Sequence, residues 1–175
     1  MEAVELPLFE MVEAFDASKH RQADTYTDYP EPELGRVRRV YDVVPIPAAE
    51  LLDAACKATV RAIDDERDRR LSAGAPYAGR LIDVSDRSRA NLSGMAVAAM
   101  AAQAGHIPWS EAYAAGWIAV DNTRVALPTP ADGLALAASV GDWCGRTIQH
   151  ARTLKDIALT SIDPAAVDWL ADWPD

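Results

Sequence analysis

The most regular hydrophobic pattern in the chain lies between residues 130 and 160. Apolar and small residues recur there every three or four positions, which is the period of one buried helix face. Thr129, Pro130 and Asp132 supply a cap, a first-turn proline and an acidic third position, so the helix is expected to begin at residue 130. The predicted core stripe is Leu136, Val140, Trp143, Thr147, Ala151, Leu154 and Ala158.

A second helix is predicted with Pro47 as its first residue, and it continues without Gly or Pro until Gly74. Its apolar stripe favours docking on the chain's own domain, with a short coiled-coil seam as the alternative, because the stripe fades within about two heptads. The alternating charges of residues 64–70 predict a solvated face with i, i+4 ion pairs. The stripe is Leu52, Cys56, Thr59 and Ile63, and the predicted pairs are Asp65 with Arg69 and Glu66 with Arg70.

A third helix is predicted over residues 87–104. Ser85 or Asp86 is placed to cap it, and Gly105 marks its end. Its core face is predicted to hold Leu92, Met95, Ala96, Ala99, Met100 and Gln103.

Small residues of the 130–160 helix form a line of their own. Ala137, Gly141 and Gly145 repeat every four positions, as in helices that pack at short range. The alanine-rich 87–104 helix is expected to fill this line. A bulky residue at Gly141 is therefore expected to destabilise the fold by about 2 kcal/mol or more.

Strand patterns between the helices are short. Leu81, Ile82 and Val84 follow a turn between Pro76 and Gly79, and residues 117–125 carry the best hairpin pattern. Two registers are possible for that hairpin. A loop at Asn122 and Thr123 places Val120 opposite Val125, Ile118 opposite Leu127 and Asp121 opposite Arg124, whereas a loop at Asp121 and Asn122 shifts the register.

Residues 1–45 are predicted to form an extended docking arm, because their polar, proline-containing sequence lacks a helical period. Only residues 36–44 alternate as a strand does. Since an unpaired strand is a liability, it is expected to gain a sheet partner from a neighbouring subunit. The interface candidates on it are Val37, Val40, Tyr41, Val43 and Val44.

The C-terminal residues 161–175 are predicted to form a short helix and a tail. Asp163 is its cap and Pro164 its first residue, and the helix is expected to carry Trp169. Trp169 and Trp173 are further interface candidates, with folding back over the chain's own core as an equal alternative. The sequence as a whole predicts an α+β fold: an N-terminal arm with a strand, then over residues 46–160 a mainly helical domain with a short strand and a β-hairpin.

Composition narrows the range of partners. The chain has 175 residues and a net charge of −10, so DNA or RNA binding is not expected, because such binding depends on Lys and Arg neutralising phosphates. No apolar run reaches membrane-spanning length, and the acidic N-terminal stretch is unlike a secretory leader. Cys56 and Cys144 are expected to be free thiols, as in a reducing cytoplasm.

Candidate chemistry is sparse. His20, His106 and His150 have no second ligand at metal-site spacing, and Ser93 lies within a predicted helix without a nucleophile elbow. No glycine-rich phosphate loop is found, and the abundant acidic residues cannot be placed in one cleft. The sequence predicts no catalytic residue, no metal ligand and no cofactor, and it favours a protein that is not an enzyme.

Residues 60–160 carry an ordered set of motifs. A helix ending in charged residues leads to the strand and cap "YAGRLIDVS" and the helix start "SRANLSG", followed by the tryptophan hairpin "GWIAVDN" and the long helix ending in "HARTLKD". This order resembles an uncharacterised domain family of tailed-phage and prophage tail proteins. The positions that carry the resemblance are Tyr77, Gly79, Ser85, Ser88, Arg89, Asn91, Leu92, Ser93, Gly94, Trp117, Asp121, Asn122, His150, Leu154, Lys155 and Asp156.

The resemblance implies a place in or near the tail, baseplate or fibres, and it brings no catalytic residue. We therefore expect a non-enzymatic virion protein, made in the host cytoplasm, whose partners are other tail or fibre proteins and possibly further copies of itself. A tail-fibre assembly chaperone that leaves before the particle is complete is the alternative. A hydrolase of host surface polymer ranks last, since no nucleophile or carboxylate pair supports it.

Overall fold

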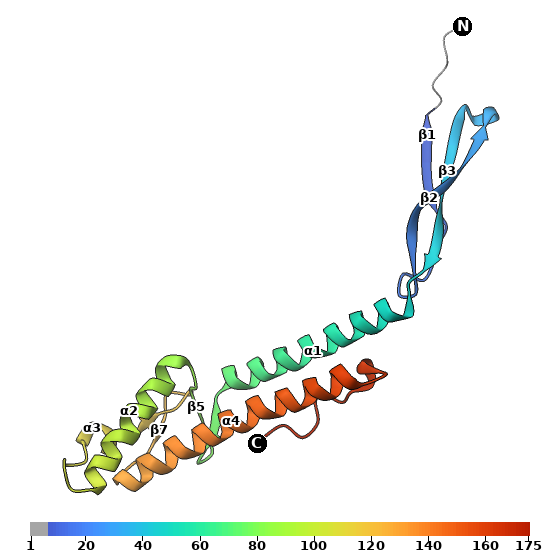
Figure 1. Cartoon of the computed structure of the whole chain (residues 1–175). Coiled ribbons are helices and arrows are strands. Elements are labelled where there is room, and N and C mark those ends of the chain that lie inside the picture. Colours follow the sequence, from blue (N-terminus) through green and yellow to red (C-terminus); the bar gives the residue numbers. More distant parts are fainter. Residues whose placement is uncertain (1–6) are drawn as a thin grey trace. The chain divides into compact units, whose positions relative to one another are not determined.

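The computed structural model describes residues 7–175 and confirms an α+β fold (Figure 1). Its contacts divide the chain into two compact units, residues 1–54 and residues 55–175. The division falls inside a helix, α1 (Ala48–Ala73), whereas the sequence predicts a boundary after residue 45. The two units are described separately.

The N-terminal unit contains a three-stranded sheet. Strands β1 (Leu8–Val12), β2 (His20–Glu31) and β3 (Arg36–Pro45) lie in the order β1-β3-β2. β1 runs parallel to β3, with Leu8 opposite Val37, and β2 runs antiparallel to β3, with Tyr26 opposite Tyr41. A short 3-10 turn, η1 (Pro32–Leu34), connects β2 to β3 and ends at Gly35, whose φ of 61° suits glycine.

This sheet corrects the prediction for residues 1–45. The strand at residues 36–44 is confirmed, but it is not unpaired, because β1 and β2 lie on either side of it. Strand β2 lies in the polar stretch that is predicted to be part of an extended arm, and it carries the strong strand formers Tyr26, Thr27 and Tyr29. Pro30 is tolerated there because β2 is an edge strand, where a missing N–H breaks no ladder hydrogen bond.

The C-terminal unit is built on two antiparallel helices, α1 and α4 (Pro130–Thr160). Lys155 Nζ, near the C-terminal end of α4, donates to Asp64 Oδ1 in the second half of α1 at 2.8 Å and joins the two helices there. Both helices are confirmed, as is the capping box of Thr129 and Asp132. Every residue of the predicted α4 stripe is buried. Of the predicted α1 stripe, Thr59 and Ile63 are buried, Cys56 is half-buried and Leu52 is exposed.

Helix α2 (Asp86–Gln103) packs antiparallel to α4 and begins at the predicted cap, Ser85. Leu92, Met95 and Ala99 are buried as predicted, while Met100 is exposed. Two small sheets complete the core: β4 (Ala75–Tyr77) pairs with β5 (Arg80–Ile82), and β6 (Trp117–Ile118) pairs with β7 (Arg124–Val125). A one-turn helix, α3 (Glu111–Ala114), precedes β6.

The β6–β7 hairpin adopts neither of the two registers considered from the sequence. Trp117 pairs with Val125 and Ile118 with Arg124, so the loop consists of residues 120–122. Asn122 has a φ of 61° and closes a three-residue loop, a geometry that Asn tolerates. Asp121 does not pair with Arg124, because its Oδ2 accepts from Arg80 Nη1 at 2.9 Å.

The predicted close helix contact at Gly141 is wrong. A Cβ added to Gly141 or Gly145 would meet nothing within 4 Å. The tight position is Gly133, near the start of α4, where an added Cβ would lie 2.9 Å from the Trp109 ring. Helix α2 approaches α4 near Gly133, and the glycines farther along α4 border a groove that is described below.

The tail also departs from its prediction. Asp163 and Pro164 do begin a turn, but it is a three-residue 3-10 helix, η2 (Pro164–Ala166), and Trp169 lies beyond it. The tail then returns over α1 and α4, where Trp173 completes a second core cluster with Ile63, Ala151, Leu154 and Ala158.

Candidate interaction surfaces

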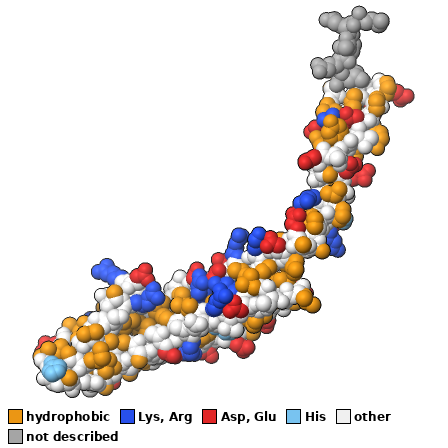
Figure 2. Space-filling view, in the orientation of Figure 1, with side chains coloured by type: hydrophobic (Ala, Val, Ile, Leu, Met, Phe, Trp, Pro, Cys, Tyr) orange, Lys and Arg blue, Asp and Glu red, His pale blue; other side chains and the backbone are white. Residues whose placement is uncertain are grey.

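The N-terminal sheet carries interlocked arginines, carboxylates and aromatic rings. Glu31 accepts from Arg36 Nε at 2.6 Å and from Arg38 Nε at 2.8 Å, so its pKa is lowered, mainly by Arg36. The two guanidinium groups also lie over the rings of Phe9 and Tyr29, at 4.6 and 4.9 Å from the centroids. Hydrophobic and charged side chains therefore alternate over this unit in Figure 2.

The opposite face repeats this arrangement around Arg39. Its guanidinium binds Asp28 through Nε at 2.8 Å and Nη2 at 3.0 Å, which lowers the pKa of Asp28. It also lies 3.7 Å from the ring centroid of Tyr26. Tyr41 donates to Glu10 at 2.9 Å, and this carboxylate raises the pKa of the phenol. Arg36, Arg38 and Arg39 are therefore already paired within the sheet.

The β3 interface candidates lie in the centre of this sheet. Four of them, Val37, Val40, Tyr41 and Val43, are half-buried, and Val44 is exposed. None of them lies at an open edge, because β3 is the middle strand. A partner can reach these side chains through the faces of the sheet, whereas strand pairing is left to β1 and β2.

The C-terminal unit has an apolar groove of about 500 Å³ between α2 and α4. In Figure 2, hydrophobic side chains gather over the end of this unit that α2 and α4 form. Arg89 is the one charged residue of the lining, and it pairs with Asp86. The lining residues are Arg89, Leu92, Ser93, Ala96, Met100, Leu134, Ala137, Ala138, Val140, Gly141 and Cys144.

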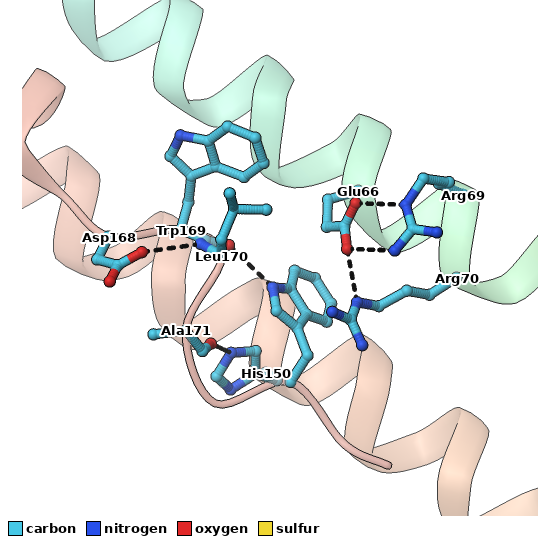
Figure 3. Close-up of polar contacts among 9 residues, drawn as sticks. Glu66, Arg69, Arg70, His150, Asp168, Trp169, Leu170 and Ala171 are labelled. Carbon is cyan, nitrogen blue, oxygen red and sulfur yellow. Dashed lines mark hydrogen bonds and ion pairs between the residues drawn. The ribbon is translucent and has the colours of Figure 1, made fainter.

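The tryptophans of the tail differ in their surroundings (Figure 3). Trp173 is 7% exposed, and its Nε1 donates to the carbonyl of Trp169 at 2.8 Å. Its ring lies 4.9 Å from that of His150 and 5.1 Å from the Arg70 guanidinium. Trp169 is half-buried beside the same cluster. Trp173 therefore folds back over the chain's own core and is not available to a partner while the tail is packed.

The carboxylate beneath this tail is Glu66, which is only 8% exposed (Figure 3). It accepts from Arg69 at 2.6 and 2.7 Å and from Arg70 Nε at 2.7 Å. These bonds, that of Arg69 first, lower its pKa from 4.5 to about 2. The predicted pair of Glu66 with Arg70 is confirmed, but Arg69 binds Glu66 in place of Asp65. The predicted solvated face holds for Asp65, Asp68 and Arg69, which are exposed, and is wrong for Glu66, which is buried.

Several motif residues have structural roles. Ser85 Oγ and Ser88 Oγ donate to Asp83 at 2.8 and 2.6 Å, and the Ser88 bond is the main cause of the lowered pKa of Asp83. His150 Nε2 lies 3.0 Å from the carbonyl of Ala171, and since a carbonyl only accepts, the ring donates there. These contacts hold a helix start and the tail in place.

The remaining candidates for chemistry lie apart. Across residues 7–175, no three His, Cys, Asp or Glu side chains come together in a way that could hold a metal ion. Cys56 is half-buried and Cys144 buried, both as free thiols, and burial raises the pKa of Cys144. In the part of the chain that the structure describes, no helix has the length and apolar character to span a bilayer.

Two features of these surfaces escaped sequence reasoning. Strand β1 holds only five residues, which is too short a run to recognise within the acidic N-terminal stretch. Trp109, which donates from Nε1 to the Leu127 carbonyl at 3.0 Å and covers Gly133, lies in an irregular connection. Its only sequence signal is the run "HIPWS", with a proline before the tryptophan and a helix-capping serine after it.

Comparison with known proteins identifies one family. The model of a family described as "Domain of unknown function (DUF4376)" matches residues 54–171, which is most of the chain and nearly all of the C-terminal unit. No curated protein and no solved structure matches the chain.

Proposed function

The chain belongs to the DUF4376 family, and we propose that it is a non-enzymatic structural component of a bacteriophage tail that binds other tail proteins through its N-terminal unit. Within that tail it belongs to the tip, the baseplate or the fibre attachment. The observation that carries the proposal is the contrast between the cores of the two units.

Not one residue between 7 and 54 is buried in the structure. The C-terminal unit, in contrast, encloses two core clusters that include Met95, Leu136 and Ile63. A small sheet without a buried face gains little from the hydrophobic effect, which must offset about 1–2 kcal/mol of backbone entropy per residue. The N-terminal sheet is therefore a unit that a partner must cover to stabilise it.

The charges of this sheet indicate what kind of partner it takes. Arg36, Arg38 and Arg39 already bind Glu31 and Asp28. Phosphate groups would have to displace these carboxylates, and the chain as a whole has a net charge of −10. Contact through backbone groups and apolar side chains, as a protein partner offers, suits this surface better than nucleic acid does.

The assignment to a phage tail rests on the resemblance of the motifs in residues 60–160. In the structure these motifs form one continuous set of elements, from the β4–β5 hairpin through α2 and the β6–β7 hairpin to α4. A self-supporting domain joined to a unit that needs a partner is the arrangement expected of a subunit that enters a larger assembly.

Mass spectrometry of purified particles tests the proposal. Particles from a strain that encodes the full chain are separated from free protein on a density gradient, and the chain is quantified against a major tail protein. A fixed stoichiometry supports a tail component. Absence from particles, combined with recovery on fibre chains in the lysate, would instead support the assembly chaperone. Absence from both would overturn the proposal.

A further inference from the structure

The two outer edges of the N-terminal sheet are not equivalent. The edge formed by β2 is irregular, because its register shifts between Gln22 and Tyr26 and Pro30 lies within it. Bulges and prolines are the features that protect an edge strand from further pairing. The edge formed by β1 has neither feature in its five residues, and its register with β3 is continuous from Leu8 to Val12.

Strand β1 presents a row of backbone hydrogen-bonding groups that have no partner strand among residues 7–175. Val37 N–H donates to the Pro7 carbonyl at 3.0 Å, so the polar groups of residue 7 point toward β3. Because these groups alternate along a strand, those of Phe9 and Met11 also point toward β3. The N–H and C=O groups of Leu8, Glu10 and Val12 therefore point away from the described sheet.

The side chains of this edge are suited to being covered. Leu8 and Phe9 are each 47% exposed, and Met11 and Val12 are half-buried. Glu10, the one charged residue of the strand, accepts from Tyr41 at 2.9 Å. Five residues without lysine, arginine or an internal proline form an edge that is open to strand addition.

We propose that β1 pairs edge to edge, in antiparallel orientation, with β1 of a second copy of this chain. An open strand edge is complementary to itself about a twofold axis, because each outward N–H then meets an outward C=O of the other copy. Arg36, Arg38 and Arg39 are paired within the sheet, and Glu10, the charged residue of this edge, accepts from Tyr41, so the edge offers no unpaired charge that would select a different partner. This inference rests on the proposed function, because it names a partner for the N-terminal unit, which that proposal describes as needing one.

The test compares two substitutions at one residue of the full-length chain. Leu8→Pro removes an outward N–H but no hydrogen bond to β3, whereas Leu8→Ala shortens the same side chain and keeps the N–H. Light scattering during size-exclusion chromatography, over a range of concentrations, should give twice the mass of 18.9 kDa for the unchanged chain and for Leu8→Ala. Leu8→Pro should raise the dissociation constant about tenfold or more.

Amide hydrogen exchange provides a second measurement. The amides of Glu10 and Val12 should be protected in the unchanged chain and exchange freely in Leu8→Pro, while those of Phe9 and Met11 stay protected in both. This pattern separates a lost dimer from a lost strand. A chain that is monomeric at every concentration, or a dimer that Leu8→Pro leaves intact, would overturn the inference. A monomeric chain found in particles at fixed stoichiometry would overturn it and leave the proposed function standing.

Discussion

The Trp109 ring covers Gly133 so closely that a Cβ on this glycine would lie 2.9 Å from Cη2 and 3.2 Å from Cζ2 of the indole. The indole cannot retreat freely, because its Nε1 donates to the Leu127 carbonyl and its ring stacks on Tyr113. Gly133 is also buried at the start of α4. The position at which α4 needs a glycine is therefore set by a side chain from a connection, not by the neighbouring helix.

Alanine substitutions at the α4 glycines should have different effects on stability, because Gly133 is covered by Trp109 whereas Gly141 and Gly145 border open space. Gly133→Ala is expected to destabilise the chain by about 1–3 kcal/mol, since the added methyl group displaces a hydrogen-bonded indole. Gly141→Ala and Gly145→Ala meet nothing within 4 Å and should stabilise it by up to about 1 kcal/mol through helix propensity. Urea unfolding followed by circular dichroism measures all three, and an equal loss at Gly141 and Gly133 would contradict the prediction.

Glu66 should make stability fall in acid. Its folded-state pKa of about 2 lies below the ordinary 4.5, so its contribution is complete above about pH 4.5 and is lost as the pH falls toward 2. At neutral pH, Glu66→Gln is expected to cost about 1–3 kcal/mol, because Arg69 is largely exposed and solvent weakens its share of the interaction.

The measurement is the free energy of unfolding of the Glu66→Gln variant and of the unchanged chain between pH 7 and pH 2.5. The difference between the two proteins should shrink as the pH falls, because protonation removes the same charge that the substitution removes. Asp65→Asn, one residue earlier on the exposed side of α1, is the control and should give a small, constant difference. A difference for Glu66→Gln that is independent of pH would contradict the assignment.

Trp173 should anchor the C-terminal tail. Trp173→Ala removes a 7%-exposed ring from the cluster of Ile63, Ala151, Leu154 and Ala158, and it is expected to cost about 3 kcal/mol. Leu170→Ala, in the same tail but 58% exposed, should change stability by less than about 0.5 kcal/mol. Thermal unfolding compares the two variants. Equal midpoints would show that the tail is detached in solution.

The parts of this fold that the sequence predicts are those with long hydrophobic periods. The α4 stripe from Leu136 to Ala158 spans many helical turns, so a single residue that breaks the hydrophobic period does not obscure it. The cap at Thr129 can be predicted because it depends only on hydrogen bonds to neighbouring residues. Of the sheet of residues 8–45, the sequence predicts only the middle strand, residues 36–44. No residue of the sheet is buried, and strands with two half-exposed faces, such as β1 and β2, leave no clear alternation of polar and apolar residues.

Other errors arose where small residues allow several arrangements. Gly141 and Gly145 have the spacing of a close helix contact, but spacing cannot tell whether a second helix occupies the line or leaves a groove beside it. The surfaces proposed for binding were only partly foreseen. The sequence predicts an unpaired strand with interface candidates from Val37 to Val44, yet the open edge belongs to β1, whose five residues carry too little pattern to be recognised.

The β6–β7 hairpin allows a direct test of its unexpected register. Asn122 holds a φ of 61° in the three-residue loop, and the Ala119 carbonyl accepts from its N–H at 2.9 Å. A left-handed backbone conformation costs a residue that has a Cβ about 1–2 kcal/mol of conformational free energy. The cost is smaller for Asn, absent for Gly and largest for β-branched residues. Stability should therefore fall in the order Gly or Asn, then Ala, then Val at position 122. Chemical unfolding of Asn122→Gly, Asn122→Ala and Asn122→Val measures it, and a valine variant as stable as the glycine variant would show that one of the two-residue loops forms instead.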